Sequence, residues 1–218
     1  MEGFSPQTLK AYQSQSLLLI GDFMDVEMEL LDTNRLKGYL AVSGKHLTKR
    51  EIEHLRESCH SSMEKVIFEF MFSTGCRIGE IVSLEKNDIN WSNQFAIVKG
   101  KGNKEREVYF NTRCDIWLKR YIESHNDNNP AIFVTVRQPH KMSVAQMRYI
   151  IKRISNRAEI NKEIHPHQLR HSYATHLLNN GAPIDVIQSL MGHEKSETKR
   201  IYAQLSGRLR KEYYQMYF

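Results

Sequence analysis

One stretch breaks the helical pattern that fills most of this chain, and it therefore limits the folds available to it. FAIVKGKGNKEREVYF, residues 95–110, contains two short apolar runs on either side of a turn with glycine and asparagine. This arrangement is typical of a β-hairpin. Because helical patterns surround a single hairpin, we expect a mainly α structure with one small antiparallel β-sheet, an α+β fold.

The helices on both sides of the hairpin carry recognisable start and stop signals. Thr48 and Glu51 form a capping box at the start of one helix, and an apolar helix over 62–72 ends at Gly75. The spacing of apolar residues predicts further helices from residue 77 onward, over 115–122, 143–157, 168–178, 184–191 and 197–205, and in the C-terminal tail. Gly192 is the stop signal of the helix over 184–191.

We predict a domain boundary near residue 44. Residues 1–43 contain two short helical patterns, and the overlapping VSGKH is typical of a linker. Residues 44–218 contain the hairpin and the remaining helices. A chain of 218 residues can bury a core without a metal or a disulfide to stabilise it.

Charge and cysteine content limit the partners and the compartment. The chain has 31 Lys and Arg against 25 Asp and Glu, a net charge of +6, which favours a polyanionic partner without requiring one. The three cysteines show no CxxC spacing, so we expect free thiols in a reducing compartment. No stretch resembles an export signal or a membrane-spanning run, so we expect a cytoplasmic protein.

Five histidines in HPHQLRHSYATHLL and LMGHEKSETKRIYAQ indicate either a metal site or a phosphate pocket. His167 and His171 are four residues apart, as in a zinc-binding helix, but the glutamate of the HExxH motif is absent. Arg170 lies in the same turn, and its permanent charge repels a divalent cation. A metal site is therefore the weaker alternative. His165, His171 and His176 each fit structural roles when taken singly.

A phosphate pocket needs several side chains of suitable chemistry, and this chain supplies them. Two arginines can clamp the non-bridging oxygens of a phosphodiester. Two histidines can donate hydrogen bonds or move a proton, a tyrosine can act as nucleophile, and a lysine in the hairpin turn can protonate a leaving 5′ oxygen. The candidates are Arg77, Lys101, His167, Arg170, His193 and Tyr202.

These residues lie in motifs that resemble those of the tyrosine recombinases, the phage integrase and Xer group. The motifs are TGCRIGEI, GKGNKER, HQLRH, GH and a tyrosine nine positions after that histidine, in the family's order and spanning most of residues 48–205. The resemblance implies a tyrosine recombinase catalytic domain and double-stranded DNA as the partner, with no cofactor, metal or ATP. It also implies a homotetramer on DNA, with a monomer in isolation left open.

The resemblance implies a covalent mechanism. Tyr202 would attack the scissile phosphate and form a 3′-phosphotyrosyl link, freeing a 5′-hydroxyl that later attacks the partner strand. Lys101 would be the general acid, although Lys104 lies in the same turn and remains an alternative. His167 would accept a proton or donate a hydrogen bond, and His193 would orient the phosphate.

Two arginines complete the implied pocket. Arg77 and Arg170 would bind the non-bridging oxygens of the phosphate. Glu80 lies one turn after Arg77, where a surface carboxylate is the ordinary reading. The resemblance implies instead that Glu80 helps to hold the arginine.

The N-terminal part differs from the family. Members usually carry a complete four-helix core-binding domain, whereas SPQTLKAYQSQSLLLIGDF and NRLKGYLA resemble only its first two helices. LTKREIEHL, the start of the catalytic domain, follows almost directly. We therefore expect a shortened core-binding domain over 1–43, a catalytic domain over 44–218, and weaker, less salt-dependent DNA binding than in a complete member.

Three rival functions and one structural alternative stay open. The rivals are a catalytically silent DNA-binding protein of the same fold, a type IB topoisomerase relative and a zinc hydrolase. The tail GRLRKEYYQMYF places apolar and aromatic residues at helical spacing, which predicts either packing on its own domain or docking on a neighbouring protomer. The predicted stripe contains Leu209, Tyr213, Met216 and Tyr217.

Overall fold

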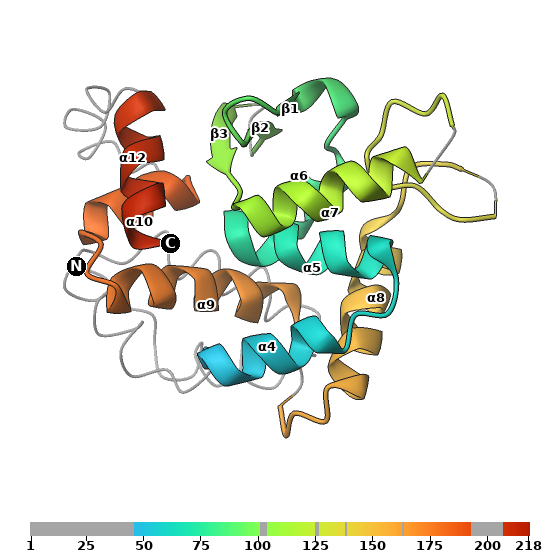
Figure 1. Cartoon of the computed structure of the whole chain (residues 1–218), viewed down its shortest axis with the longest axis horizontal. Coiled ribbons are helices and arrows are strands. Elements are labelled where there is room, and N and C mark those ends of the chain that lie inside the picture. Colours follow the sequence, from blue (N-terminus) through green and yellow to red (C-terminus); the bar gives the residue numbers. More distant parts are fainter. Residues whose placement is uncertain (1–45, 101–103, 125–126, 138, 163, 193–206) are drawn as a thin grey trace, which may run out of the picture.

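The computed structural model describes residues 46–100, 104–124, 127–137, 139–162, 164–192 and 207–218, and it confirms the mainly helical fold with one small antiparallel sheet (Figure 1). The predicted helices before residue 46 and over 197–205 lie outside these ranges. The described elements are α4 (Lys49–Glu57), α5 (Ser62–Thr74), α6 (Ile78–Val82), η1 (Lys86–Asp88), β1 (Ile89–Asn90), β2 (Phe95–Lys99), β3 (Glu105–Tyr109), α7 (Thr112–Glu123), α8 (Val144–Arg157), α9 (Pro166–Asn179), α10 (Ile184–Met191) and α12 (Gly207–Tyr217).

Helix α5 forms the centre of the core. All residues from 66 to 74 are buried, so this helix needs cover on every side. Helices α7, α8 and α9 pack against it, and Figure 1 shows α5 between α7 and α9. Glu69 is the one charged residue in this buried stretch, and it pairs with Arg56 of α4.

Local signals set the helix ends as predicted. The Thr48 side chain accepts the Glu51 N–H at 3.2 Å, and the Thr48 N–H donates to the Glu51 carboxylate at 2.8 Å. Helix α5 ends at Gly75 with φ of 61°, and α10 ends at Gly192 with φ of 72°. Both values lie in the left-handed region that favours glycine, so each helix stops at a defined residue.

The predicted hairpin is confirmed as β2 and β3, which pair antiparallel with Ala96 opposite Val108 and Val98 opposite Arg106. A third strand, β1, pairs with the outer edge of β2 and was not predicted. Ala96, Val98 and Val108 are buried, so one face of the sheet covers the core. Arg106 shares that face, because side chains two residues apart in a strand point the same way.

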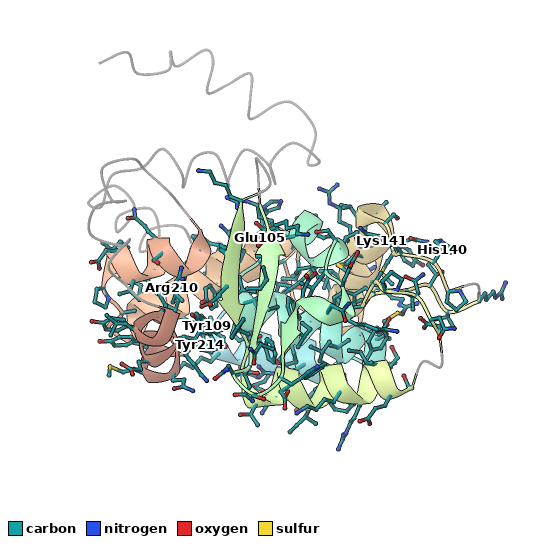
Figure 2. The ribbon with its side chains drawn as sticks, turned by 90° about the horizontal axis from the view of Figure 1, so that it is seen from above. Glu105, Tyr109, His140, Lys141, Arg210 and Tyr214 are labelled. Atoms are coloured by element: carbon teal, nitrogen blue, oxygen red, sulfur yellow. The ribbon has the colours of Figure 1, made fainter. Side chains whose placement is uncertain are left out.

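The C-terminal helix α12 packs on its own domain, against α10 and β3. Tyr214 is buried with its ring 5.8 Å from that of Tyr109, and Figure 2 shows the two rings beside each other between α12 and β3. Arg210 approaches Glu107 at 3.9 Å. The predicted apolar stripe is therefore partly wrong, because Tyr214 makes the buried contact while Met216 is 69% exposed. Tyr214 takes the buried position because its ring packs against those of Tyr109 and Phe218.

The predicted N-terminal domain, residues 1–43, lies outside the described residues, so the two-domain division stays a prediction. The helices in the described ranges are all too short or too polar to cross a bilayer.

Candidate active site

Arg77 stands at the start of α6, directly after the turn that ends α5. Glu80, one helical turn later, is 5% exposed and accepts the backbone N–H of Arg77 at 2.8 Å. The same carboxylate lies 3.4 Å from Nη1 of Arg77, whose side chain is 24% exposed. Glu80 therefore holds Arg77, as the resemblance implied.

Arg106 is the residue that the sequence analysis missed. Its Nη1 and Nη2 donate to the two oxygens of Glu80 at 2.6 and 2.8 Å, a two-pronged ion pair between β3 and α6. A signal was present in the sequence, because Arg106 lies two residues before Val108 on the core-facing side of a strand. A charge at such a position needs a partner inside the protein.

The electrostatics of Glu80 follow from its surroundings. Burial by itself raises the pKa of this carboxyl, but the hydrogen bonds and charge of Arg106, the charge of Arg170 and the Arg77 N–H outweigh burial and lower the pKa to about 2. The pKa of Arg106 is correspondingly raised by Glu80 despite its burial. Glu80 thus contacts two guanidinium groups, that of Arg106 in β3 and that of Arg77 at the start of α6.

Arg170 lies on α9 and is 1% exposed. Its Nη1 donates to the carbonyl of Gly75, and its Nη2 donates to the carbonyl of Met191 at 2.9 Å. These carbonyls belong to the ends of α5 and α10, where a helix has no partners of its own for its last C=O groups. Arg170 therefore joins two helix ends and faces protein backbone in this conformation.

His167 lies in the first turn of α9, three residues before Arg170, so both share a helix face. It is half-buried. Gln168 closes the helix start by accepting the N–H of His165 at 2.7 Å. The N-terminus of this 14-residue helix favours an anion, which suits a phosphate.

Two other histidines have the surroundings of structural residues. His176 Nε2 lies 2.9 Å from the Leu47 carbonyl, and its ring meets Phe72 edge-on at 5.6 Å. Burial lowers the pKa of His176. His171 is 0% exposed. Within the described ranges, no three His, Cys, Asp or Glu side chains are grouped so that they could hold a metal ion.

Lys101, His193 and Tyr202 lie outside the described residues. Gly100 and Gly192, which directly precede Lys101 and His193, are described, and both lie beside the pair of Glu80 and Arg106. A Cβ on Gly100 would lie 3.5 Å from Glu80 Oε1, and a Cβ on Gly192 would lie 2.6 Å from Nε of Arg106. The structure therefore places Arg77, Gly100 and Gly192 beside the pair of Glu80 and Arg106. Arg170 contacts the neighbouring carbonyls of Gly75 and Met191.

Comparison with known sequences supports one family. The model of the phage integrase family matches residues 45–208. Tyrosine recombinase XerA of Pyrococcus horikoshii is 31% identical over 186 residues, which cover 84% of this chain and 64% of the relative. Tyrosine recombinase XerC of Pediococcus pentosaceus is 37% identical over 165 residues, covering 70% of this chain and 53% of the relative.

Solved structures agree with the sequence comparison. The XerA recombinase crystal structure superposes with a TM-score of 0.65 at 30% identity, covering 78% of this chain and 62% of that one. XerH bound to its difH substrate in a pre-cleavage complex gives 0.59 at 26% identity, covering 77% and 52%. The chain spans between about half and two thirds of the length of the relatives it matches. With a family match over most of its residues and the fold of the recombinase catalytic domain, this chain belongs to the phage integrase family of tyrosine recombinases.

Proposed function

We propose that this chain is the catalytic part of a site-specific tyrosine recombinase that cleaves and rejoins double-stranded DNA. One observation carries the proposal: Arg170, one of the two predicted phosphate ligands, donates to the carbonyl of Gly75, which lies two residues before Arg77, the other predicted ligand. Relatives named as recombinases, and one of them solved with its DNA substrate, support the same reading. DNA is therefore the proposed partner.

The proposed chemistry is a transesterification. The Tyr202 oxygen attacks the scissile phosphorus, the bond from phosphorus to the 5′ oxygen breaks, and a 3′-phosphotyrosyl link forms. His167 takes the proton of the tyrosine, and Lys101, or Lys104 as the alternative, gives a proton to the leaving 5′ oxygen. A 5′-hydroxyl then attacks the link and releases the tyrosine. Because the phosphotyrosine keeps the energy of the broken ester, no metal or ATP takes part.

Positive charge stabilises the transition state in this scheme. Arg77 and Arg170 bind the non-bridging oxygens, and His193 donates a further hydrogen bond. Arg170 is 1% exposed, so the clamp requires its guanidinium to become accessible when DNA binds. The N-terminus of α9 favours the same anion.

A nicked DNA pool tests the proposal without knowledge of the target site. The substrates are duplexes with randomised arms and a nick downstream of the cleavage position. After cleavage, the short strand with the 5′-hydroxyl dissociates, so the strands cannot be rejoined and the covalent complex is trapped. We expect an SDS-resistant adduct that forms in EDTA and disappears in Tyr202→Phe. Tyr149→Phe is the matched control, because Tyr149 lies on α8 and is 65% exposed. Sequencing the trapped DNA then identifies the site.

Other outcomes select other functions. DNA binding without any adduct indicates the silent DNA-binding protein, and loss of the adduct in EDTA indicates metal-dependent chemistry. The burial of Arg170 is the observation that favours the silent alternative, since a guanidinium facing backbone carbonyls is not presented to DNA.

We also infer the organisation of the protein in the cell. Residues 1–43 would form a shortened core-binding domain and residues 44–218 the catalytic domain of a cytoplasmic, bacterial or phage-encoded protein. The active species would be a homotetramer on DNA. Analytical ultracentrifugation with and without the sequenced site checks the assembly. A salt titration as steep as that of a complete two-domain relative would contradict the shortened domain.

A further inference from the structure

We propose that Arg106 is a positioning residue of the cleavage pocket. It fixes the relative positions of three backbone segments, each of which ends beside a residue assigned to the chemistry. The inference rests on the proposed function and extends it, because Arg106 itself is not among the groups that touch the phosphate.

The first segment is the start of α6. Arg106 holds both oxygens of Glu80 at 2.6 and 2.8 Å, and Glu80 holds the backbone N–H of Arg77 at 2.8 Å. A carboxylate bound at both oxygens by a planar guanidinium has a fixed orientation. The direction of Arg77 is therefore set by Arg106 through Glu80.

The second segment is the hairpin turn. The N–H of Gly100 donates to the carbonyl of Lys104 at 2.8 Å, which joins the residues that follow β2 and precede β3. A Cβ on Gly100 would lie 3.5 Å from Glu80 Oε1 and 3.7 Å from Arg106 Nη1. Gly100, the residue directly before Lys101, therefore lies beside the ion pair, so a shift of the pair would move this backbone.

The third segment is the end of α10. Gly192 has φ of 72°, and a Cβ there would lie 2.6 Å from Nε and 2.7 Å from Cδ of Arg106. The backbone is therefore packed directly on the arginine side chain. Arg170 holds the preceding carbonyl, that of Met191, at 2.9 Å. Two arginines thus fix the last peptide groups before His193.

A stabilising role alone predicts a different outcome from a positioning role. Apolar residues often replace a buried ion pair without loss of stability, so stability does not require charges at this place. A positioning residue instead affects the rate of the chemical step at saturating DNA. Displacement of a reacting group by about 1 Å costs on the order of 100-fold in rate.

The test compares Arg106→Lys and Arg106→Gln with the wild-type chain. Arg106→Lys keeps the charge opposite Glu80 but loses the two-pronged geometry. Arg113→Gln is the matched control, since it removes one arginine charge from α7 at a side chain that is 51% exposed. Three quantities are measured for each: the single-turnover rate of adduct formation at saturating protein, the DNA affinity in the Tyr202→Phe background, and the thermal midpoint.

We expect Arg106→Lys to form the adduct about 100-fold more slowly, with DNA affinity and thermal midpoint close to wild type. Arg113→Gln should cleave at the wild-type rate. If Arg106→Lys is folded and cleaves within about threefold of wild type, Arg106 does not position the pocket, even if Arg106→Gln fails to fold. If the wild-type chain itself forms no adduct, the proposed function is wrong and the role of Arg106 in it falls too.

Discussion

Replacing Glu80 by glutamine should destabilise the protein at neutral pH and should remove part of its sensitivity to acid. Glu80 is 5% exposed and accepts both Nη groups of Arg106. Glutamine keeps the shape of the side chain but carries no charge, so it leaves the guanidinium of Arg106, whose side chain is only 13% exposed, without its counter-ion. The effect on stability should therefore depend on pH in a predictable direction.

The pKa of Glu80 sets the size of the effect. This pKa is lowered from 4.5 to about 2 in the folded protein, so the ionised carboxylate stabilises the fold at every pH above about 4.5. A tenfold change in proton affinity is worth about 1.4 kcal/mol, so the contribution at pH 7 is about 3 kcal/mol. It declines as the pH falls from about 4.5 towards the folded pKa of about 2, and about 2 kcal/mol is gone by pH 3.

Urea unfolding of wild type and Glu80→Gln at several pH values between 7 and 3 measures this difference. Comparing the two proteins at each pH cancels the titration of all other carboxyls. We expect wild type to be more stable by about 3 kcal/mol at pH 7, with the gap narrowing to about 1 kcal/mol at pH 3. Glu105→Gln is the control, because its carboxylate is 60% exposed and 3.9 Å from Lys99, where an ion pair contributes little.

A gap that stays constant from pH 7 to pH 3 would refute the reasoning, since it would mean that the charge of Glu80 is not what stabilises the fold. A difference in unfolding free energy below about 1 kcal/mol at pH 7 would mean that the ion pair of Glu80 and Arg106 contributes no more than an exposed surface pair.

Three further predictions concern the fold. Gly75→Ala should cost about 2 kcal/mol or more in thermal unfolding, because φ is 61° and a Cβ would clash with the ring of Tyr173. Gly79→Ala is the control: a Cβ there would meet no atom within 4 Å, so the change should be neutral or slightly stabilising. Equal effects of the two substitutions on stability would contradict the structure. Burial raises the pKa of all three cysteine thiols, so a thiol reagent at pH 8 should react quickly only after unfolding in urea. Tyr214→Ala should cost about 3–5 kcal/mol in urea unfolding, against about 0.5 kcal/mol for Met216→Ala, which is 69% exposed; similar losses would place α12 elsewhere.

Features set by neighbouring residues in the chain could be predicted from the sequence. The capping box at Thr48 and the left-handed glycines at Gly75 and Gly192 depend on a few adjacent residues, and all three were correct. The hairpin was correct because both strands carry apolar runs around a turn. Strand β1 was missed because two residues are too few to show an alternation.

Features set by packing between distant segments could not be predicted in the same way. The pair between Arg106 and Glu80 spans 26 residues and exists only when the hairpin folds onto α6. The buried face of α12 was assigned partly wrongly, since the ring of Tyr109 in β3 decides that Tyr214 turns inward. Family motifs identified Arg77 and Arg170, but their short-range pattern does not show that Arg170 ends up 1% exposed.

Glu80 lies closer to the guanidinium of Arg106 than to that of Arg77, and this difference leads to a last prediction. Arg106 takes both oxygens at 2.6 and 2.8 Å, whereas the guanidinium of Arg77 approaches only at 3.4 Å and its side chain is 24% exposed. The carboxylate therefore compensates the charge of Arg106 far more than that of Arg77. Arg77→Gln should cost about 1 kcal/mol in urea unfolding, and Arg106→Gln about 3–5 kcal/mol. Equal losses would mean that Glu80 binds both arginines alike, and the positive charge assigned to the phosphate would then already be neutralised inside the protein.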